Sequence, residues 1–284
     1  MKLNPKVFIQ TNKFQNFGAR LAAFSFIKNS EIDVDISFVE AETVGVAQLF
    51  GKTILRSGQH HRYKNDLQSF TPVRFFVPEI MNYKGAALVI DPDVFCVRIS
   101  GNDWRQLFDF IGRYSITAVQ ASPTGFHSSV MGLDCRRLHW SSKAILEKLE
   151  RMTIDYTDLM KLREEVENIK PLDPRFNQFD KIDRHTVFLH TTERATQPWR
   201  TGLPTNFEKK RPKAIKSKFL SVIAPQKFEV PKFHLQHPCR RVDSFVAQLL
   251  VMALDEGYLS ESDIDSAILS EQVRPDVYEW MKMC

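Results

Sequence analysis

The sequence Gly85-Ala86-Ala87-Leu88-Val89-Ile90-Asp91-Pro92-Asp93-Val94-Phe95-Cys96-Val97 is an apolar run that two aspartates interrupt at its centre. Because its apolar and β-branched residues cluster without helical spacing, residues 88–90 and 94–97 are predicted as buried β-structure. Pro92 has no amide hydrogen and a fixed φ angle, so it ends the ladder and holds the two carboxylates on a rigid corner. Taken alone, this corner favours a plain turn. The alternative is a site for a divalent cation with hard oxygen ligands.

The amino-acid composition is that of a globular protein with enough apolar residues to form a hydrophobic core. The chain has 284 residues, of which 43% are apolar and 26% are charged, enough for one large domain or a domain with an appendage. The start of the chain does not read as a signal peptide, and no apolar run reaches the roughly 18 residues of a membrane span. The four cysteines show no C-x-x-C spacing, which favours a reduced compartment. We therefore expect a cytoplasmic protein.

The first forty residues predict a βαβ unit. Residues 6–12 and 34–40 read as strands, and residues 19–28 between them read as a helix. Ligands of such sheets gather beyond the carboxyl ends of the strands, which marks Gln10, Thr11 and Asn12 as nucleotide contacts. A plain loop is the alternative for these three residues.

The middle of the chain continues the α/β pattern. Residues 42–64 are expected to form a loop with a short helix, in which adjacent histidines at 60 and 61 are solvated rather than metal-binding. Arg74 lies among apolar residues just before the aspartate strand, so its guanidinium either pairs with a core acid or reaches an anionic ligand. Further elements are predicted as helices over residues 69–81, 103–110, 141–152 and 155–168, and as strands over residues 115–120, 128–134 and 186–190.

His190 closes the last predicted strand. A lone histidine at the end of an apolar strand is usually a structural group that pairs with the backbone. Here, however, an imidazole would complete the mixed nitrogen and oxygen ligand set that a Mn²⁺-type ion prefers, with Asp91 and Asp93 supplying the negative charge.

The C-terminal part differs in character from the rest. The net charge of +5 is concentrated in residues 206–232, a basic stretch with three prolines that reads as a linker or an extended arm wrapping the core. A solvated arm is the plainer alternative. Contact of this arm with anionic lipid, peripheral to a membrane, is the open alternative. Residues 243–256 and 260–269 read as two short helices. Such helices do not fold alone, so we expect them to dock on the core or on a second subunit, which leaves a homodimer open.

The order of these features resembles the retaining glycosyltransferases of family 8, the glycogenin and galactosyltransferase-like group with a GT-A fold. The resemblance covers residues 6–204. Its strongest pieces are Arg74-Phe75-Phe76-Val77-Pro78-Glu79 with the Asp91-Pro92-Asp93 strand, and Leu189-His190 with Gln197-Pro198-Trp199. Weaker pieces are residues 128–131, in place of an Asn-x-Gly strand, and residues 155–160, in place of an Asp-Gln helix start.

The resemblance implies a fold and an activity. The fold would be α/β of the GT-A, Rossmann-like type, with a mixed, mainly parallel sheet flanked by helices. Residues 1–204 would form the nucleotide-sugar-binding catalytic domain, and residues 205–284 a basic arm and a small helical C-terminal extension. The activity would be transfer of a sugar, with retention in this family's manner, from a nucleotide sugar such as a UDP-sugar to the hydroxyl of a glycan, a lipid-linked or a protein acceptor.

The resemblance also implies roles for individual residues. Mn²⁺ or Mg²⁺ would be held by Asp91, Asp93 and His190. Asp155 would lie beside the sugar, with a helix N-cap as the alternative. The residues that would contact the nucleotide-sugar donor are Gln10, Thr11, Asn12, Arg74, Asp91 and Trp199.

Departures from the family pattern keep other functions open. Gln197 replaces a lysine that meets the diphosphate, Tyr156 replaces a glutamine, and Arg194 or Arg200 is the candidate to supply the missing charge. The alternatives are a catalytically inactive GT-A-fold binding or scaffold protein and a nucleotidyltransferase. The latter is disfavoured because no glycine-rich loop follows the first strand. Nucleic acid is not expected as a partner, because the basic stretch lacks interleaved aromatic residues.

Overall fold

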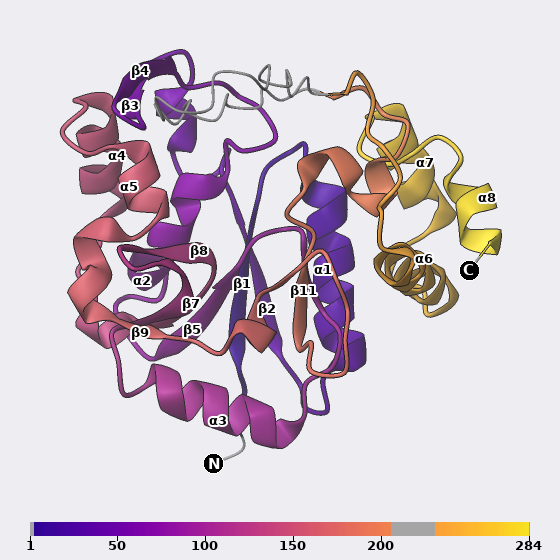
Figure 1. The fold of residues 1–284 in the computed structure, drawn as a ribbon, viewed down its shortest axis with the longest axis horizontal. Coiled ribbons are helices and arrows are strands. Elements are labelled where there is room, and N and C mark those ends of the chain that lie inside the picture. Colours follow the sequence, from indigo (N-terminus) through magenta and orange to yellow (C-terminus); the bar gives the residue numbers. More distant parts are fainter. Residues whose placement is uncertain (1–2, 206–230, 284) are drawn as a thin grey trace, which may run out of the picture.

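The structure is a computed structural model that describes residues 3–205 and 231–283. A six-stranded mixed sheet forms its centre, in the order β2-β1-β5-β8-β7-β9 (Figure 1). The pairs β1/β2, β1/β5 and β7/β9 are parallel, whereas β8 is antiparallel to both β5 and β7. The mixed, mainly parallel sheet expected from the sequence is thereby confirmed. Its strands are β1 (Lys6–Thr11), β2 (Asp35–Glu40), β5 (Ala86–Ile90), β7 (Ile116–Ser122), β8 (Gly125–Asp134) and β9 (Ile169–Pro171).

A second, three-stranded sheet brings distant segments to the aspartate corner. It has the order β10 (Gln178–Phe179), β11 (Phe188–His190) and β6 (Val94–Cys96). Because β11 runs antiparallel to β6, His190 pairs with Val94, the residue that directly follows Asp93. The register of one short strand pair therefore sets the histidine beside the two acids.

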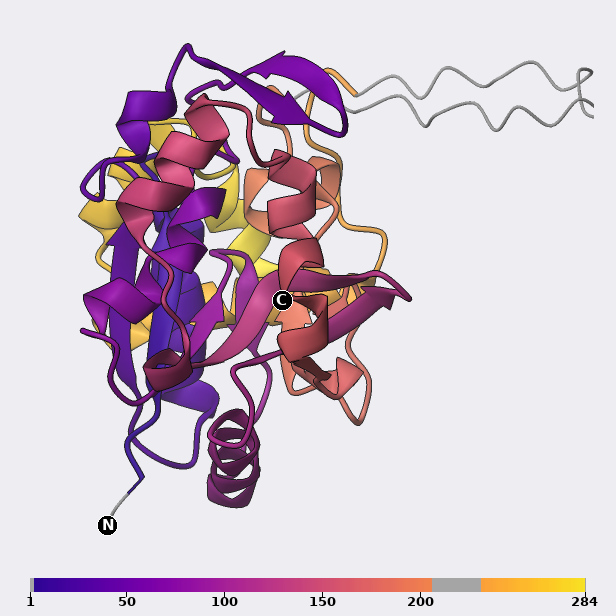
Figure 2. The same ribbon diagram turned by 90° about the vertical axis from the view of Figure 1, so that its left-hand side faces the viewer.

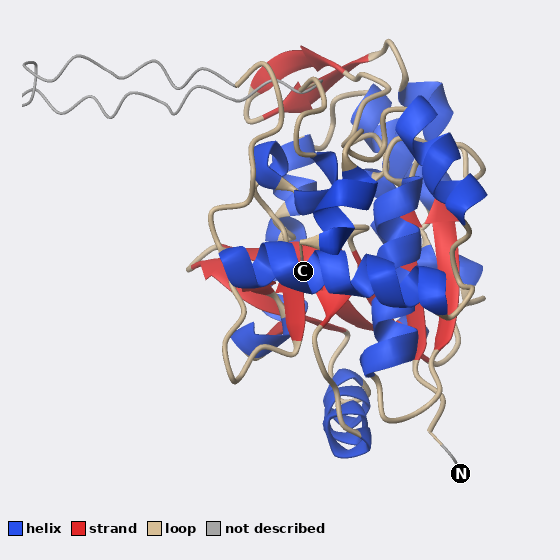
Figure 3. Cartoon of the chain, turned by 90° about the vertical axis from the view of Figure 1, so that its right-hand side faces the viewer, coloured by secondary structure: helices blue, strands red, loops and turns tan. Residues whose placement is uncertain are grey.

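Helices cover both faces of the central sheet. On one face, α1 (Asn16–Asn29) and α6 (Arg240–Asp255) pack in one hydrophobic cluster with β6 and β11. Figure 3 shows helices in front of the strands on this side of the molecule. On the other face, α4 (Ser142–Glu150) belongs to a second cluster with Val89 and Met131. The remaining helices are α2 (Val77–Ile80), α3 (Gly101–Ile111), α5 (Tyr156–Met160), α7 (Glu261–Leu269) and α8 (Val277–Lys282).

Short 3-10 helices complete the described part of the chain. They are η1 (Val46–Leu49), η2 (Thr71–Phe75), η3 (Cys135–Arg137), η4 (Arg163–Asn168), η5 (Pro174–Phe176), η6 (Arg194–Thr196) and η7 (Pro198–Arg200). The helix predicted over residues 69–81 is therefore two short pieces, η2 and α2.

Two predicted elements are wrong in detail. The expected loop over residues 42–64 contains a β-hairpin of β3 (Thr53–Arg56) and β4 (Gln59–Arg62), which lies above α4 and α5 in Figure 2. The helix expected over residues 155–168 ends after one turn and resumes as η4, because Leu162 has a left-handed φ of 54° that no α-helix contains.

The C-terminal helices dock on the core of the same chain. The buried residues Val246, Leu250 and Trp280 belong to the hydrophobic cluster that includes Phe24 of α1. Residues 206–230 of the predicted basic arm lie outside the described residues. Within residues 3–205 and 231–283, no helix combines the length and the hydropathy that crossing a bilayer requires.

Candidate metal centre

The aspartate corner forms where β5 ends. The amide of Asp91 donates to the Ser129 carbonyl at 2.9 Å, and the amide of Val94 donates back to the Asp91 carbonyl at 3.2 Å. Helix α1 approaches the corner at Gly18. A Cβ atom there would lie 3.2 Å from the Pro92 carbonyl and 3.1 Å from the Trp199 ring, which is tighter than ordinary van der Waals contact. The corner is thus a packed feature of the core rather than a surface turn.

The structure brings together the three predicted metal ligands. One ligand atom from each of Asp91, Asp93 and His190 lies within 4.8 Å of the other two. Their side chains are 13%, 11% and 8% exposed. Oxygen ligands lie about 2.1–2.5 Å from Mg²⁺ or Ca²⁺, so two ligands of one ion are at most about 5 Å apart. The three side chains can therefore hold a single ion with little rearrangement.

Two side chains fix Asp91. Arg74 Nη2 donates to Asp91 Oδ1 at 2.9 Å, and the Gln10 amide donates to the same oxygen. Arg74 Nε in turn donates to Gln10 Oε1 at 3.2 Å. No residue in the described ranges donates to Asp91 Oδ2, so this oxygen keeps its lone pairs for a cation. Burial raises the pKa of the Asp91 carboxyl to about 6, although the Arg74 guanidinium opposes this shift.

Side-chain amides orient the other two ligands. Asn177 Oδ1 lies 2.9 Å from His190 Nδ1 and so favours the tautomer with a proton on Nδ1. Nε2 then faces Asp93 Oδ1 at 3.3 Å, while Gln197 Nε2 donates to Asp93 Oδ2 at 2.9 Å. Burial alone would lower the pKa of His190, but the Asp93 carboxylate raises it above its ordinary value. Hydrogen bonds of this kind hold metal ligands in place in many metalloproteins.

The chemistry of these donors fits a divalent cation. Asp91 and Asp93 supply two negative charges and His190 supplies one imidazole nitrogen, a mixed set that suits Mn²⁺-type ions. The only cationic side chain bonded to the triad is Arg74, through Asp91 Oδ1, which leaves the side facing His190 without a bound cationic partner among residues 3–205 and 231–283.

The predicted nucleotide contacts Thr11 and Asn12 shape the edge of the sheet. Asn12 Nδ2 donates to the Asp66 carbonyl and to Ser69 Oγ, both at 2.9 Å. Its Oδ1 accepts from the amides of the next turn, and Thr11 is fully buried. Only Gln10 of the three predicted residues reaches the triad. Contact of Thr11 or Asn12 with a nucleotide stays a prediction.

Trp199 packs behind the corner. It is 1% exposed, and its ring meets Phe95 edge-on with centroids 5.5 Å apart. The ring therefore buttresses β6 and α1 in this structure, and its predicted contact with a donor stays a prediction.

Asp155 has the geometry of the N-cap alternative. Its Oδ1 accepts from the amides of Thr157 and, at 3.0 Å, Ser57, and its Oδ2 accepts from the amide of Gly58 at 2.6 Å. Burial alone would raise the pKa of the Asp155 carboxyl, but these backbone hydrogen bonds lower it below its ordinary value. The carboxylate therefore joins α5 to the turn of the β3–β4 hairpin. Its predicted place beside a sugar stays a prediction.

The two candidate arginines have different surroundings. Arg200 is 3% exposed and donates to the carbonyls of Phe14 and Glu271 at 3.3 and 3.4 Å, so it joins the N-terminal loop to the C-terminal helices. Burial lowers the pKa of Arg200 to about 10. Burial and the neighbouring Arg56 guanidinium lower the pKa of Arg194.

Sequence reasoning missed Asn177 and His127. Asn177 follows the η5 turn, and nothing in the sequence links it to a histidine 13 residues away. The ring of His127 meets Phe179 edge-on at 4.7 Å, and Phe179 meets His190 at 5.4 Å. Burial, together with His190 and Lys161, lowers the pKa of His127, so a half-buried neutral imidazole lies one ring away from the triad.

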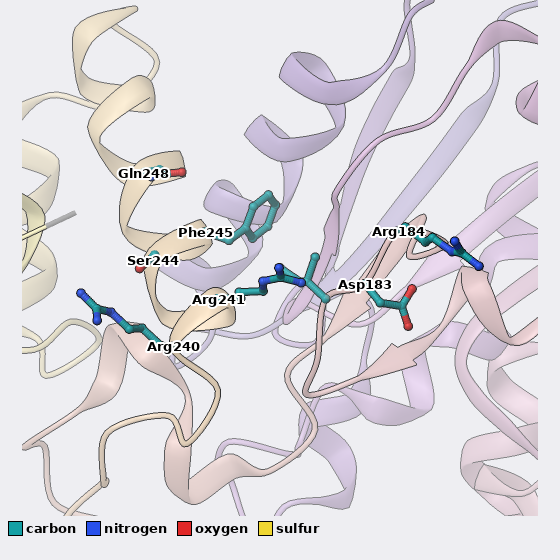
Figure 4. A pocket seen from close by; sticks show the side chains of 8 residues that line it. Asp183, Arg184, Arg240, Arg241, Ser244, Phe245 and Gln248 are labelled. Atoms are coloured by element: carbon teal, nitrogen blue, oxygen red, sulfur yellow. The ribbon is translucent and has the colours of Figure 1, made fainter.

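A separate cavity of about 650 Å³ lies between α6 and residues 182–184. These residues precede β11, whereas His190 ends it, so the cavity and the triad belong to opposite ends of that strand. Figure 4 shows Arg184 and Arg240 on opposite sides of this cavity, with Phe245 and Arg241 between them. Its polar side chains do not converge on one point.

Comparisons with known proteins gave structural matches only. No family model and no curated protein matches the sequence. Glycosyltransferase GlyE of Streptococcus pneumoniae is 15% identical, with a TM-score of 0.48, over 73% of this chain and 57% of GlyE, so the match spans little more than half of that protein. Mouse xyloside xylosyltransferase 1 is 13% identical over 67% of this chain and 98% of that chain, with a TM-score of 0.45. An active-site mutant of LgtC is 14% identical over 68% of this chain and 89% of that chain, also with a TM-score of 0.45.

The matched proteins are glycosyltransferases, the class of enzyme to which the sequence resemblance points. Identities of 13–15% show a likeness in fold alone.

Proposed function

We propose that this chain is a metal-dependent glycosyltransferase that moves a sugar from a nucleotide sugar to an acceptor hydroxyl. The observation that carries the proposal is the triad of Asp91, Asp93 and His190, whose ligand atoms lie within 4.8 Å of one another in the core. The family resemblance carried by the order of the sequence motifs supports two further parts of the proposal. The donor would be a UDP-sugar, and the transfer would proceed with retention. A glycan, a lipid-linked molecule or a protein would serve as the acceptor.

The triad residues would hold Mn²⁺ or Mg²⁺, which when bound stabilises the negative charge of a leaving diphosphate. Hydrogen bonds from neighbouring side chains already orient the triad for a cation. Arg74 and Gln10 both bond to Asp91 Oδ1 and so leave Oδ2 for the cation. Asn177 keeps the lone pair of His190 Nε2 on the side of Asp93. On the front-face route that the resemblance implies, the proton of the acceptor hydroxyl passes to the leaving phosphate.

A second candidate is a GT-A-fold binding protein without transferase activity. The hydrogen bonds that Asp155 and Tyr156 already make within the protein favour this second candidate. Both oxygens of Asp155 accept backbone hydrogen bonds, and the Tyr156 hydroxyl bonds to Thr71 while its ring packs edge-on against Tyr63. In this candidate the triad would still bind a cation and a nucleotide diphosphate, but no group would be left to orient the sugar.

A donor screen tests the proposal. Release of UDP, GDP or CMP from the corresponding nucleotide sugars would be measured with Mn²⁺, for the wild type and for His190→Ala. His185→Ala is the matched control, because His185 is an exposed histidine on the loop before β11. We expect release from one UDP-sugar that His190→Ala abolishes and His185→Ala preserves. Mn²⁺-dependent binding of UDP without release from any donor would support the binding protein, and absence of both would refute both candidates.

A further inference from the structure

The side chain of Gln197 belongs to the candidate cation site. We infer that Gln197 is a positioning residue there: its Nε2 holds Asp93, and its Oε1 accepts a hydrogen bond from a water molecule bound to the cation. This inference rests on the proposed function, because it requires a divalent cation at the triad.

The backbone fixes where this side chain starts. Gln197 joins η6 to η7 in an extended conformation (φ −60°, ψ 121°), and its carbonyl accepts from the amide of Arg200 at 3.0 Å. The next two residues, Pro198 and Trp199, are buried. Gln197 itself is fully buried and its amide reaches Asp93, so the side chain enters the core at the acidic corner.

The two ends of the Gln197 amide are in unequal surroundings. Nε2 donates to Asp93 Oδ2 at 2.9 Å, whereas Oε1 is buried and accepts no hydrogen bond from the described residues. The oxygen and nitrogen of one amide are about 2.3 Å apart, so Oε1 lies within about 5 Å of Asp93 Oδ2. A buried amide oxygen without a donor is unfavourable, and Gln197 is fully buried.

The missing partner has to be a hydrogen-bond donor. Ionised Asp91 and Asp93 only accept, so the acids of the triad cannot serve Oε1. Mg²⁺-type cations usually keep several of their water ligands, and those waters are polarised donors. Because the amide is neutral, Gln197 also leaves both negative charges of the triad for the ion. A water on a cation held by Asp93 would therefore be a donor of the kind that Oε1 lacks, on the side of the site where Gln197 bonds to Asp93.

Gln15 shows why the bond to Asp93 is essential to this inference. Its Oε1 is also buried without a partner in the described residues, and its Nε2 donates to the Leu67 carbonyl at 3.4 Å. Yet no carboxylate of the triad contacts it. An unpartnered amide oxygen alone therefore indicates no ligand, and Gln15 provides a control of the same chemistry elsewhere in the core.

The test is Mn²⁺ affinity, measured on the full chain by the electron paramagnetic resonance signal of free Mn²⁺. We expect Gln197→Met, which has a similar volume but no amide, to raise the dissociation constant about 10- to 100-fold. Gln15→Met should leave it unchanged. The electron paramagnetic resonance spectrum of Mn²⁺ bound to the wild type should broaden in ¹⁷O-enriched water, because the inference requires a water ligand on the ion. With a nucleotide sugar present, the transferase activity of Gln197→Met should recover at high Mn²⁺ concentration. A general loss of packing would not allow this recovery.

The outcomes separate the inference from the proposed function. Wild-type affinity in Gln197→Met would overturn the inference and leave the cation site standing. Failure of the wild type to bind Mn²⁺ would overturn both. If Gln197→Met does not fold, as shown by its thermal unfolding without metal, the wild type decides, and a spectrum of bound Mn²⁺ that ¹⁷O-enriched water does not broaden would overturn the inference.

Discussion

Arg74 is the residue that keeps an ionised carboxylate inside this core. It is 4% exposed and bonds to Asp91, Gln10 and the hydroxyl of Ser128. We expect Arg74→Met to lower the free energy of unfolding by about 3 kcal/mol at pH 7.5, because breaking a buried ion pair leaves an unpaired charge. Below pH 6 the loss should shrink, since Asp91, whose pKa burial raises to about 6, becomes protonated. Urea unfolding at pH 5 and 7.5, with EDTA, measures both values.

The double variant Arg74→Met with Asp91→Asn is the control for this effect. Because it removes the uncompensated charge, it should be more stable at pH 7.5 than Arg74→Met alone. Equal stability of the single and double variants would show that Arg74 acts through packing rather than through its charge.

The buried imidazole of His234 is expected to lower the stability of the fold in acid. It is 2% exposed, and burial together with the Arg200 charge lowers the pKa of its imidazole to about 4. The unfolded chain therefore binds the proton more tightly, and stability present above pH 6.5 is lost as the pH falls toward 4. We expect the drop in unfolding free energy between pH 7.5 and 4.5 to be about 2 kcal/mol smaller in His234→Leu than in the wild type. An identical drop in both proteins, by urea unfolding, would show that other groups dominate.

The sequence allowed the three residues of the triad and the pairing of Arg74 with a core acid to be predicted, but not the side-chain amides that bond to Asp93 and His190. Asp91 and Asp93 lie between two predicted strands and His190 ends a third, and the ends of strands are where side chains converge. Asn177 and Gln197 lie in turns whose local sequence specifies only a turn. Their roles depend on the pairing of β11 with β6, which places residues far apart in the sequence side by side.

At the scale of elements, strands with apolar side chains were predictable and the polar hairpin was not. The β3–β4 hairpin was missed because β4 reads Gln-His-His-Arg, without an apolar alternation. Only Ile54 of β3 is fully buried, and the turn is held from outside by Asp155. The predicted helix of residues 155–168 failed for a related reason, since the charged η4 has no buried residue that would keep the helix packed.

The Asp155 carboxylate should stabilise the hairpin turn and α5 together. We expect Asp155→Ala to speed hydrogen exchange of the amides of Ser57, Gly58 and Thr157 roughly fivefold, since loss of an N-cap costs about 1 kcal/mol. Exchange in β1 should not change. Hydrogen exchange followed by NMR gives these rates residue by residue. Asp155→Asn keeps one oxygen acceptor, so retained protection with lost transfer activity would instead support the role beside the sugar that the sequence resemblance implies.

At the scale of the whole molecule, the C-terminal helices are part of the same core as the sheet. Helices α1 and α6 share one hydrophobic cluster, and Arg20 of α1 pairs with Asp263 of α7 at 2.7 Å. The amide of Arg274 also donates to the Trp199 carbonyl at 2.7 Å, next to the turn that carries Gln197. The helical extension thus supports the back of the candidate cation site, although the two regions are distant in sequence.

This shared core predicts a single unfolding transition for the sheet and the C-terminal helices. Trp280 is 1% exposed and donates to Asp243 Oδ2 at 3.1 Å, so Trp280→Ala should cost about 3–5 kcal/mol. Because α6 packs on α1, the loss should lower the urea midpoint of the whole chain. Circular dichroism would report all helices. In a background with the other cysteines replaced by alanine, the reaction of a thiol reagent with Cys96, which is buried in β6, would report the sheet. Coincident midpoints in both proteins are expected, whereas an early transition confined to the helical signal in Trp280→Ala would show that the extension unfolds on its own.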